Sequence, residues 1–286
     1  MCGIVGYIGK GCAKDVVLDG LGKLEYRGYD SAGIALLDKG RLAVEKIAEI
    51  QDENNKSKIA KLQDLLKEKY LDANVAIGHT RWATHGTPSI LNAHPHVSND
   101  GMIAVVHNGI VENYSELKEM LLKKHNIRCK SETDSEVIAQ LLSVFCADGL
   151  DLVDAMLKAT GMMKGAYAIG AIYKNDENKI VGYRKDAPLI ACHTDEGTFI
   201  ASDMTALLKH SKDVYFLDDD ELVVCKADSM QILNRDKEVV EKEIFHIDWN
   251  IETAEKGGYD HFMLKEIHDQ PDVLEDTLSR RLDSNG

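Results

Sequence analysis

The chain has 286 residues, of which 44% are hydrophobic and 29% charged, and its formal net charge is -14 at pH 7. This length suits one large domain or two small ones, with the composition of a folded globular protein. The acidic balance disfavours non-specific nucleic-acid binding, and no apolar run is long enough to span a membrane. The six cysteines form no CxxC pair and follow no secretory signal, so we expect a reduced, cytoplasmic protein without disulfides.

The first half of the chain mixes short strands with amphipathic helices. Residues 3–9 are typical of a buried strand, and apolar residues at helical spacing predict a helix over residues 12–24. The runs on either side of Lys39-Gly40 indicate a hairpin. Further strands are predicted at residues 74–79 and 102–107, and further helices near residues 59–66, 113–122, 133–145 and 150–162. Asn113 is the expected N-cap of one helix, and Thr133 with Glu136 the expected capping box of the next.

The second half consists mainly of short strand-like runs separated by turn residues, which implies largely antiparallel pairing. These runs are Ala166–Tyr173, Lys179–Arg184, Leu189–His193, Thr198–Ser202, Asp213–Phe216, Leu222–Lys226 and Met230–Leu233. Neither GxGxxG nor GxxxxGK occurs, so no phosphate-binding loop is indicated. The pattern favours two sheets packed face to face with helices outside. From residue 236 onward the chain is polar and weakly patterned, which indicates a tail or linker.

Cys2 is the first residue with a clear chemical use. A cysteine at this position normally allows the initiator methionine to be removed, and Cys2 would then carry the free α-amine of the chain. The thiol is an intrinsically strong nucleophile, and an α-amine with a typical pKa of about 7.7–8.0 can act as its base. If Met1 stayed attached, that amine would become an amide and could not serve. The plainer alternative is that Cys2 packs as a small hydrophobic residue.

Three polar stretches point to the same chemistry: Gly78–Gly86, His107–Asn113 and Ser131–Asp134. Together with Cys2–Gly6 they resemble the class II glutamine amidotransferases, whose glutaminase domain is an N-terminal-nucleophile hydrolase. Glu25–Ser31 and Lys265–Pro271 make the chain more similar to members that aminate a sugar phosphate. The resemblance implies an α+β fold, a four-layer α/β/β/α sandwich with mainly antiparallel sheets.

The resemblance also implies roles for individual residues, which suit the chemistry of glutamine. Arg81 would bind the α-carboxylate through its planar guanidinium, and Asp134 would bind the α-ammonium. Attack by Cys2 on the side-chain amide would create an oxyanion, which is stabilised by preorganised donors. The resemblance assigns these donors to the Asn108 side chain and the Gly109 N–H.

The same resemblance places Trp82, Thr84 and His85 along the glutamine site, in a loop that closes over the substrate. Arg27 would orient the N-terminus or the substrate. Residues 2–235 would form the glutaminase domain, and residues 236–286 a linker toward a sugar-isomerase half that receives the ammonia. The implied partners are L-glutamine and that half, with a homodimer allowed, and no cofactor is expected.

Each site residue also has a structural explanation. Asn108-Gly109 could be only a tight turn, Arg81 a surface ion pair, and Asp134 a helix N-terminal carboxylate. The histidines at positions 79, 85, 94, 96 and 107 lack a recognised zinc spacing, so no metal is expected.

Two other functions stay open. One is the glutaminase half of an amidophosphoribosyltransferase, against which residues 25–31 argue. The other is a non-catalytic glutamine-sensing module, which would be expected to have replaced Cys2, Arg81, Asn108 or Asp134.

Overall fold

The computed structural model describes residues 2–48, 56–83, 86–248, 258–259 and 262–279. Contacts divide the chain into two compact units, Met1–Ile247 and Asp248–Gly286. By its contacts, the segment up to Ile247 belongs to the first unit. The domain boundary expected after residue 235 stays a prediction.

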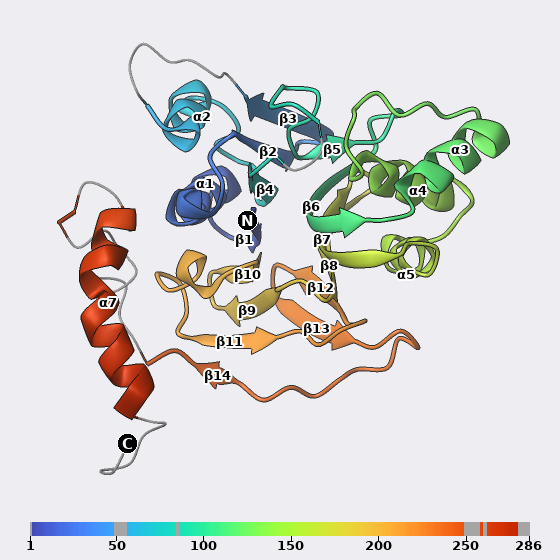
Figure 1. Ribbon diagram of the computed structural model, residues 1–286. Coiled ribbons are helices and arrows are strands. Elements are labelled where there is room, and N and C mark those ends of the chain that lie inside the picture. Colours follow the sequence, from blue (N-terminus) through green and yellow to red (C-terminus); the bar gives the residue numbers. More distant parts are fainter. Residues whose placement is uncertain (1, 49–55, 84–85, 249–257, 260–261, 280–286) are drawn as a thin grey trace. The chain divides into compact units, whose positions relative to one another are not determined.

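An eight-stranded sheet forms one layer of the first unit, in the strand order β14-β11-β9-β10-β1-β4-β2-β3 (Figure 1). Its strand pairs are antiparallel. The strands are β1 (Gly3–Gly9), β2 (Ser31–Asp38), β3 (Arg41–Ile47), β4 (Val75–Arg81), β9 (Ile190–Thr194), β10 (Gly197–Ala201), β11 (Asp213–Phe216) and β14 (Phe245–His246). The chain's first strand therefore lies in the interior of this sheet, between β10 and β4.

A six-stranded sheet forms the second layer, in the order β13-β12-β8-β7-β6-β5, again with antiparallel pairs. Its strands are β5 (His96–Val97), β6 (Ile103–Val111), β7 (Gly165–Tyr173), β8 (Asp176–Lys185), β12 (Leu222–Lys226) and β13 (Ser229–Leu233). Inward-facing residues of both sheets, such as Ile4, Ile77, Val106, Ile172 and Val223, form one buried core. The two sheets therefore pack face to face.

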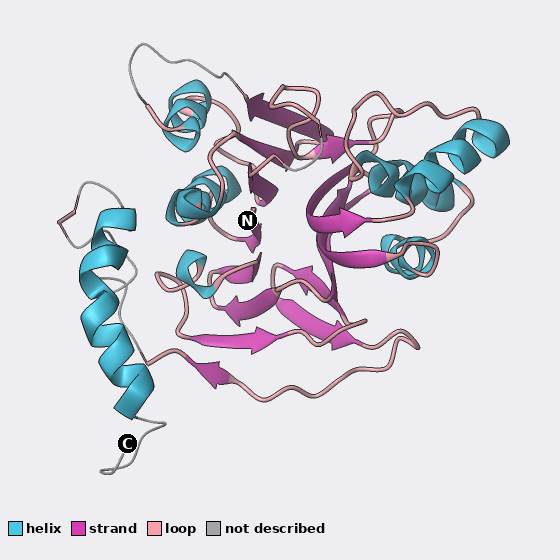
Figure 2. Cartoon of the chain, viewed as in Figure 1, coloured by secondary structure: helices cyan, strands magenta, loops and turns pink. Residues whose placement is uncertain are grey.

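Helices cover the outer faces, as Figure 2 shows. They are α1 (Ala13–Lys23), α2 (Lys58–Leu66), α3 (Tyr114–His125), α4 (Glu136–Ala147) and α5 (Leu152–Thr160), with short 3-10 turns η1 (Glu25–Arg27) and η2 (Met204–Ala206). The α1 helix packs on β1 and β4, while α4 and α5 share a second core with β6 to β8 and β12. The predicted four-layer α/β/β/α sandwich is confirmed.

A buried lysine from helix α1 caps the C-terminal end of helix α2. Lys14, on α1, is almost inaccessible, and its Nζ donates to the main-chain carbonyls of Leu66 at 2.9 Å, Lys69 at 3.1 Å and Lys67 at 3.3 Å. The last carbonyls of a helix lack intrahelical partners, and a cation satisfies them well. Lys14 thus joins the two helices on this side of the sandwich.

The predicted Thr133–Glu136 capping box is wrong, whereas Asn113 is confirmed as the N-cap residue of α3 but makes no side-chain capping hydrogen bond. The α4 helix begins at Glu136, after Ser135, and the Glu136 carboxylate accepts the main-chain N–H groups of Lys130 and Ser131. Thr133 instead contacts His96 through its hydroxyl, at 3.1 Å. Asn113 does precede α3, but its side chain joins Met162 and Lys164 across the start of β7. Tertiary partners have outcompeted local capping in both places.

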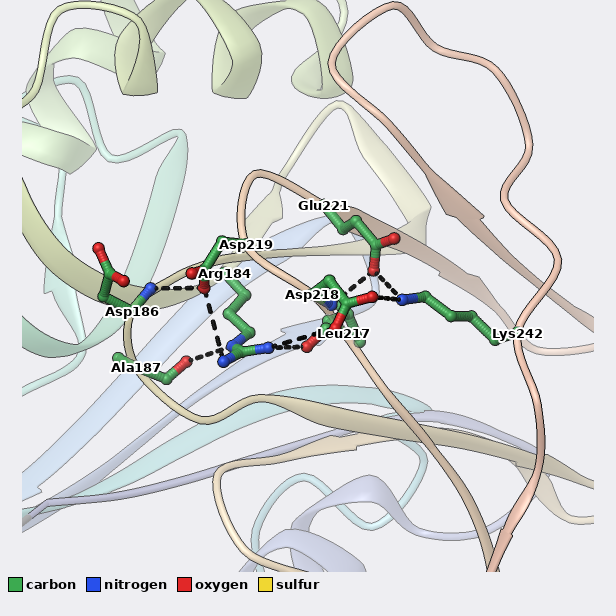
Figure 3. Close-up of polar contacts among 8 residues, drawn as sticks. All are labelled: Arg184, Asp186, Ala187, Leu217, Asp218, Asp219, Glu221 and Lys242. Carbon is green, nitrogen blue, oxygen red and sulfur yellow. Dashed lines mark hydrogen bonds and ion pairs between the residues drawn. The ribbon is translucent and has the colours of Figure 1, made fainter.

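A polar corner holds the end of the first unit in place (Figure 3). Arg184, on β8, donates to the carbonyls of Ala187 and Leu217 and pairs with Asp219 at 3.5 Å. Lys242, in the segment that follows β13, pairs with both Asp218 at 2.5 Å and Glu221 at 2.8 Å. These contacts tie the segment leading to β14 onto the β11–β12 turn.

The second unit contains α7 (Phe262–Ser279), where the sequence indicated only a weakly patterned tail. Its exposed apolar residues Leu264, Ile267, Leu274 and Leu278 recur at helical spacing, but Pro271 and the many charged residues obscured this pattern. Among the described helices of the chain, none is long and apolar enough to cross a membrane.

Candidate active site

Cys2 lies immediately before β1, next to the end of β4. The antiparallel register places Gly3 opposite Thr80, so Cys2 lies next to the residues that follow Thr80 in the chain. Its Sγ accepts the main-chain N–H of Trp82 at 3.3 Å and lies 3.6 Å from the Trp82 carbonyl oxygen. Gly28 makes this arrangement possible, because a Cβ there would lie 2.9 Å from the Trp82 nitrogen. Cys2 is therefore held at a defined point rather than packed as a core residue.

The thiol of Cys2 is tuned by opposing effects. Burial raises its pKa, while the Trp82 N–H and the positive charge of Arg81 act to lower it. A raised pKa means that the thiol is largely protonated near neutral pH and needs a base to become a nucleophile. The α-amine that processing of Met1 would expose on Cys2 is suited to this task.

Asn108 and Gly109 come from the second sheet. The predicted strand was expected to end at His107, but β6 continues to Val111, and Asn108 and Gly109 pair with Ala168 and Tyr167 of β7. The alternative that they form only a tight turn is therefore wrong. The Asn108 Nδ2 donates to the Cys2 carbonyl at 3.1 Å, which brings this donor group beside the cysteine.

Gly109 is required by close packing of two strands. Its φ is +121°, a conformation that L residues with side chains rarely adopt. An added Cβ would lie 2.0 Å from the Ala166 carbonyl oxygen, so no side chain fits between β6 and β7 here. The main chain at Gly109 consequently lines the cavity directly.

Arg81 and Asp134 both line the same cavity. Arg81, the last residue of β4, is buried, so the alternative of a surface ion pair is wrong. Its Nη2 donates to the Gly86 carbonyl at 3.3 Å. Burial lowers the pKa of the Arg81 guanidinium, but Cys2 and Asp134 are close enough to act in the opposite direction. Asp134 is also buried, two residues before α4 begins, and its Oδ2 accepts the Val111 N–H at 2.7 Å.

The cavity unites most of the predicted residues. Its described lining consists of Cys2, Arg81, Trp82, His94, His107, Gly109, Thr133, Asp134 and Ser135. Trp82 is half exposed and meets Tyr29 edge-on, with ring centroids 5.5 Å apart. Thr84 and His85 lie outside the described residues. Arg27 and Asn108 are both absent from the described lining: the Arg27 guanidinium pairs with Asp203 at 2.5 Å, and Asn108 contacts the Cys2 carbonyl.

Two further links support the site and were not predicted. Asn92 donates to the Glu132 carboxylate at 2.9 Å and accepts the Glu132 N–H at 3.0 Å. These two hydrogen bonds join the loop after Gly86 to the loop before Asp134. The Gly86 carbonyl in turn accepts a hydrogen bond from Arg81. A buried asparagine and a glutamate far apart in sequence give no local signal of such a pairing.

Four histidines, at positions 79, 94, 96 and 107, are buried together beside the cavity. The rings of His79 and His94 lie 4.1 Å apart, and those of His94 and His96 4.6 Å apart. Burial lowers the pKa of each of the four, to about 3 for His79, which favours the neutral imidazole at each position. Within the described part of the chain, no group of three or more histidine, cysteine or acidic residues is placed to hold a metal ion.

The fold and the cavity together define the class of protein. The glutamine amidotransferase domain family matches residues 64–247, and the chain belongs to this family. The fold is shared with the glutamine phosphoribosylpyrophosphate amidotransferase of B. subtilis, at a TM-score of 0.66 and 24% identity over 83% of this chain and 50% of that one. A class-II glutamine aminotransferase domain protein of Silicibacter pomeroyi is similar over 82% of this chain and 99% of its own, at a TM-score of 0.55 and 13% identity.

Curated relatives give a narrower match. The glutamine–fructose-6-phosphate aminotransferase (isomerizing) of Clostridium perfringens is 48% identical over 99% of this chain, and that of Aquifex aeolicus is 47% identical over 97%. The chain spans only 44% and 45% of the length of these two relatives. It is therefore similar to one half of each.

Proposed function

We propose that this chain hydrolyses L-glutamine to glutamate and ammonia through a thioester on Cys2. The observation that carries the proposal is that Cys2, Arg81, Asp134 and Gly109 line one cavity. A nucleophile, a cation for a carboxylate and an anion for an ammonium are what an amino acid with a reactive side-chain amide requires.

The proposed reaction has two halves. The Cys2 sulfur attacks the amide carbon, and its proton is passed through the α-amine to the amide nitrogen. The carbon–nitrogen bond then breaks, ammonia leaves, and a glutamyl thioester remains. Water attacks the thioester, the carbon–sulfur bond breaks, and glutamate leaves as the thiol is restored. Asn108 and Gly109 would stabilise the oxyanion that forms in each half.

Other residues have supporting roles in this proposal. Arg81 would hold the substrate α-carboxylate and Asp134 the α-ammonium, with Trp82, Thr84 and His85 covering the bound glutamine. Arg27 would act indirectly, because its pairing with Asp203 fixes the turn that packs against Arg81 and Trp82 through Gly28.

The ammonia would serve a partner in the full-length enzyme. We infer that residues 2–235 form the glutaminase domain and residues 236–286 lead toward a sugar-isomerase half, where fructose 6-phosphate becomes glucosamine 6-phosphate. Relatives with this named activity, matched over 44% to 45% of their length, support the inference. A homodimer is compatible with it. The free state of all six cysteines, each in the described residues, supports a cytoplasmic location.

Ammonia release from glutamine by the purified chain tests the proposal. Wild type should release ammonia and glutamate in equal amounts, whereas Cys2→Ala should be inactive and equally stable. Cys12→Ala is the matched control, because Cys12 contacts Tyr70 and neither residue is in the described cavity lining, and it should remain active. Intact mass should show that the active species has lost Met1. Substantial turnover by pure Cys2→Ala protein would refute the mechanism.

A further inference from the structure

His79 makes a contact that none of the assigned roles uses. Its Nε2 lies 3.0 Å from the Asn108 Oδ1 and also 3.0 Å from the His107 carbonyl oxygen. His79 belongs to β4 in the first sheet, and Asn108 to β6 in the second. The imidazole therefore bridges the two sheets immediately behind the residue that contacts Cys2.

These partners determine the tautomer of His79. A carbonyl oxygen can only accept a hydrogen bond, so the proton of the neutral ring must be on Nε2. Both the His107 carbonyl and the Asn108 Oδ1 share that proton. The other ring nitrogen, Nδ1, is buried and has no partner among the described residues, which suits an unprotonated nitrogen.

The tautomer in turn determines how Asn108 is oriented. With Oδ1 accepting from His79, the Nδ2 group points to the Cys2 carbonyl, 3.1 Å away. Rotating the amide by half a turn would place two donors together at His79 and two acceptors together at Cys2. Only one orientation satisfies every group, and it directs the asparagine donor toward the cysteine.

The fold holds the His79 ring itself in place. The register puts Gly33 of β2 opposite His79 of β4. A Cβ on Gly33 would lie 2.2 Å from the His94 carbonyl oxygen, so the absence of a side chain lets the His94 segment cross the sheet there. The His94 ring consequently packs against the His79 ring, with centroids 4.1 Å apart. Tight packing on one side leaves the imidazole little freedom to turn.

We propose that His79 is a positioning residue, which orients the Asn108 amide so that its N–H faces the oxyanion formed at Cys2. The inference rests on the proposed glutaminase function. It assigns His79 no contact with glutamine, so its effect should appear in the rate of the chemical step rather than in substrate binding.

The test compares His79→Phe, which keeps an aromatic ring but removes the donor, with His79→Gln, which can restore a donor to Asn108. His79→Phe should lower kcat for glutamine hydrolysis by about tenfold or more, up to the roughly 10²–10³-fold expected for losing an oxyanion donor, with KM unchanged. His79→Gln should recover part of the loss. His96→Phe is the matched control, since His96 contacts Thr133 instead, and its kcat should stay near wild type.

A double-mutant comparison separates positioning from general destabilisation. If His79 acts only through Asn108, then His79→Phe should cause no further loss of kcat in an Asn108→Ala background. Losses that multiply, a defect confined to KM, or a His79→Gln variant as impaired as a folded His79→Phe would overturn the proposal. If His79→Phe fails to fold, His79→Gln takes its place in the double-mutant comparison. His79→Gln should then lower kcat relative to wild type but cause no further loss in the Asn108→Ala background.

Failure of the proposed function would look different. In that case wild type would release no ammonia, or Cys2→Ala would retain turnover. The rate of Cys2 alkylation by iodoacetamide, followed by peptide mass spectrometry, should be similar in wild type and His79→Phe. This readout shows that the nucleophile is intact while the positioning contact is lost.

Discussion

The carboxylate of Asp134 accepts the main-chain N–H of Val111 at 2.7 Å, which ties the turn before α4 to the end of β6. Val111 lies two residues beyond Gly109 on the same strand. The proposed ammonium ligand and the proposed oxyanion donors are therefore fixed to one another through the main chain. The second Asp134 oxygen lies 3.4 Å from the Ser135 hydroxyl.

Asp134→Asn should weaken glutamine binding with little change in fold. The amide oxygen can still accept the Val111 N–H, but the negative charge that would face the substrate ammonium is lost. We expect KM for glutamine to rise roughly 10- to 100-fold, the equivalent of one charge-assisted hydrogen bond. Steady-state kinetics with glutamine measure this. A fall in kcat at unchanged KM would contradict the assignment.

Arg81→Lys should also raise KM, because an ammonium cannot reproduce the planar, two-pronged contact of a guanidinium with a carboxylate. The loss should depend on the substrate: a glutamine analogue without the α-carboxylate should bind wild type and Arg81→Lys about equally. Competition by such an analogue and by glutamate measures the difference. Equal loss of affinity for both compounds would show that Arg81 is structural.

Asn108→Ala should act on the transition state rather than on substrate binding. Removing one oxyanion donor typically costs about 2.7–4 kcal/mol of barrier, or roughly 10²–10³ in kcat. Single-turnover ammonia release should show this loss, while the affinity for glutamate stays near that of wild type. A variant whose defect lies wholly in glutamate affinity, or whose rate is near normal, would remove Asn108 from the oxyanion site.

The buried histidines should make the fold sensitive to acid. In the unfolded chain an imidazole binds a proton below its ordinary pKa of about 6.5, whereas burial lowers the pKa of His79 to about 3 in the folded protein. Between pH values of about 6.5 and 3, unfolding therefore takes up protons, and the free energy of unfolding falls as the pH is lowered through this range.

His94→Phe tests this linkage without removing a hydrogen bond, because both His94 ring nitrogens have no partner among the described residues. The free energy of unfolding, measured with urea from about pH 5 to 7, should vary less with pH in this variant, by up to about 1.4 kcal/mol per pH unit. An unchanged slope would mean that His94 has a near-normal pKa in the folded state.

Lys14→Met should destabilise the first unit. The methionine keeps most of the apolar stem but leaves the carbonyls of Leu66, Lys67 and Lys69 without their charged donor. We expect a loss of about 1–3 kcal/mol in the free energy of unfolding. Lys10→Met, at an exposed position, is the control and should change stability little. Equal effects of the two variants would show that the α2 contact contributes nothing.

The amino-acid sequence by itself determined most of the secondary elements and the family resemblance. Apolar periodicity is a local property, so the strand at residues 3–9 and the hairpin at residues 31–47 followed from the residues alone. Cys2, Arg81 and Asp134 could be named as site candidates because the family resemblance implied their roles and their side-chain chemistry suits glutamine. The helix at residues 262–279 was missed because its pattern is interrupted by Pro271 and many charges.

Only the tertiary structure decided how these residues meet. Asn108 and Gly109 lie within a strand rather than in a turn, because β7 pairs with β6 as far as Val111. The contacts of Asn108 with Cys2 and with His79 join residues 106 and 29 positions apart, and they depend on the stacking of two sheets. Likewise, Asn92 and Glu132 pair only because two loops come together beside Arg81. Local sequence specifies which groups are available, whereas register and packing specify which of them share a cavity.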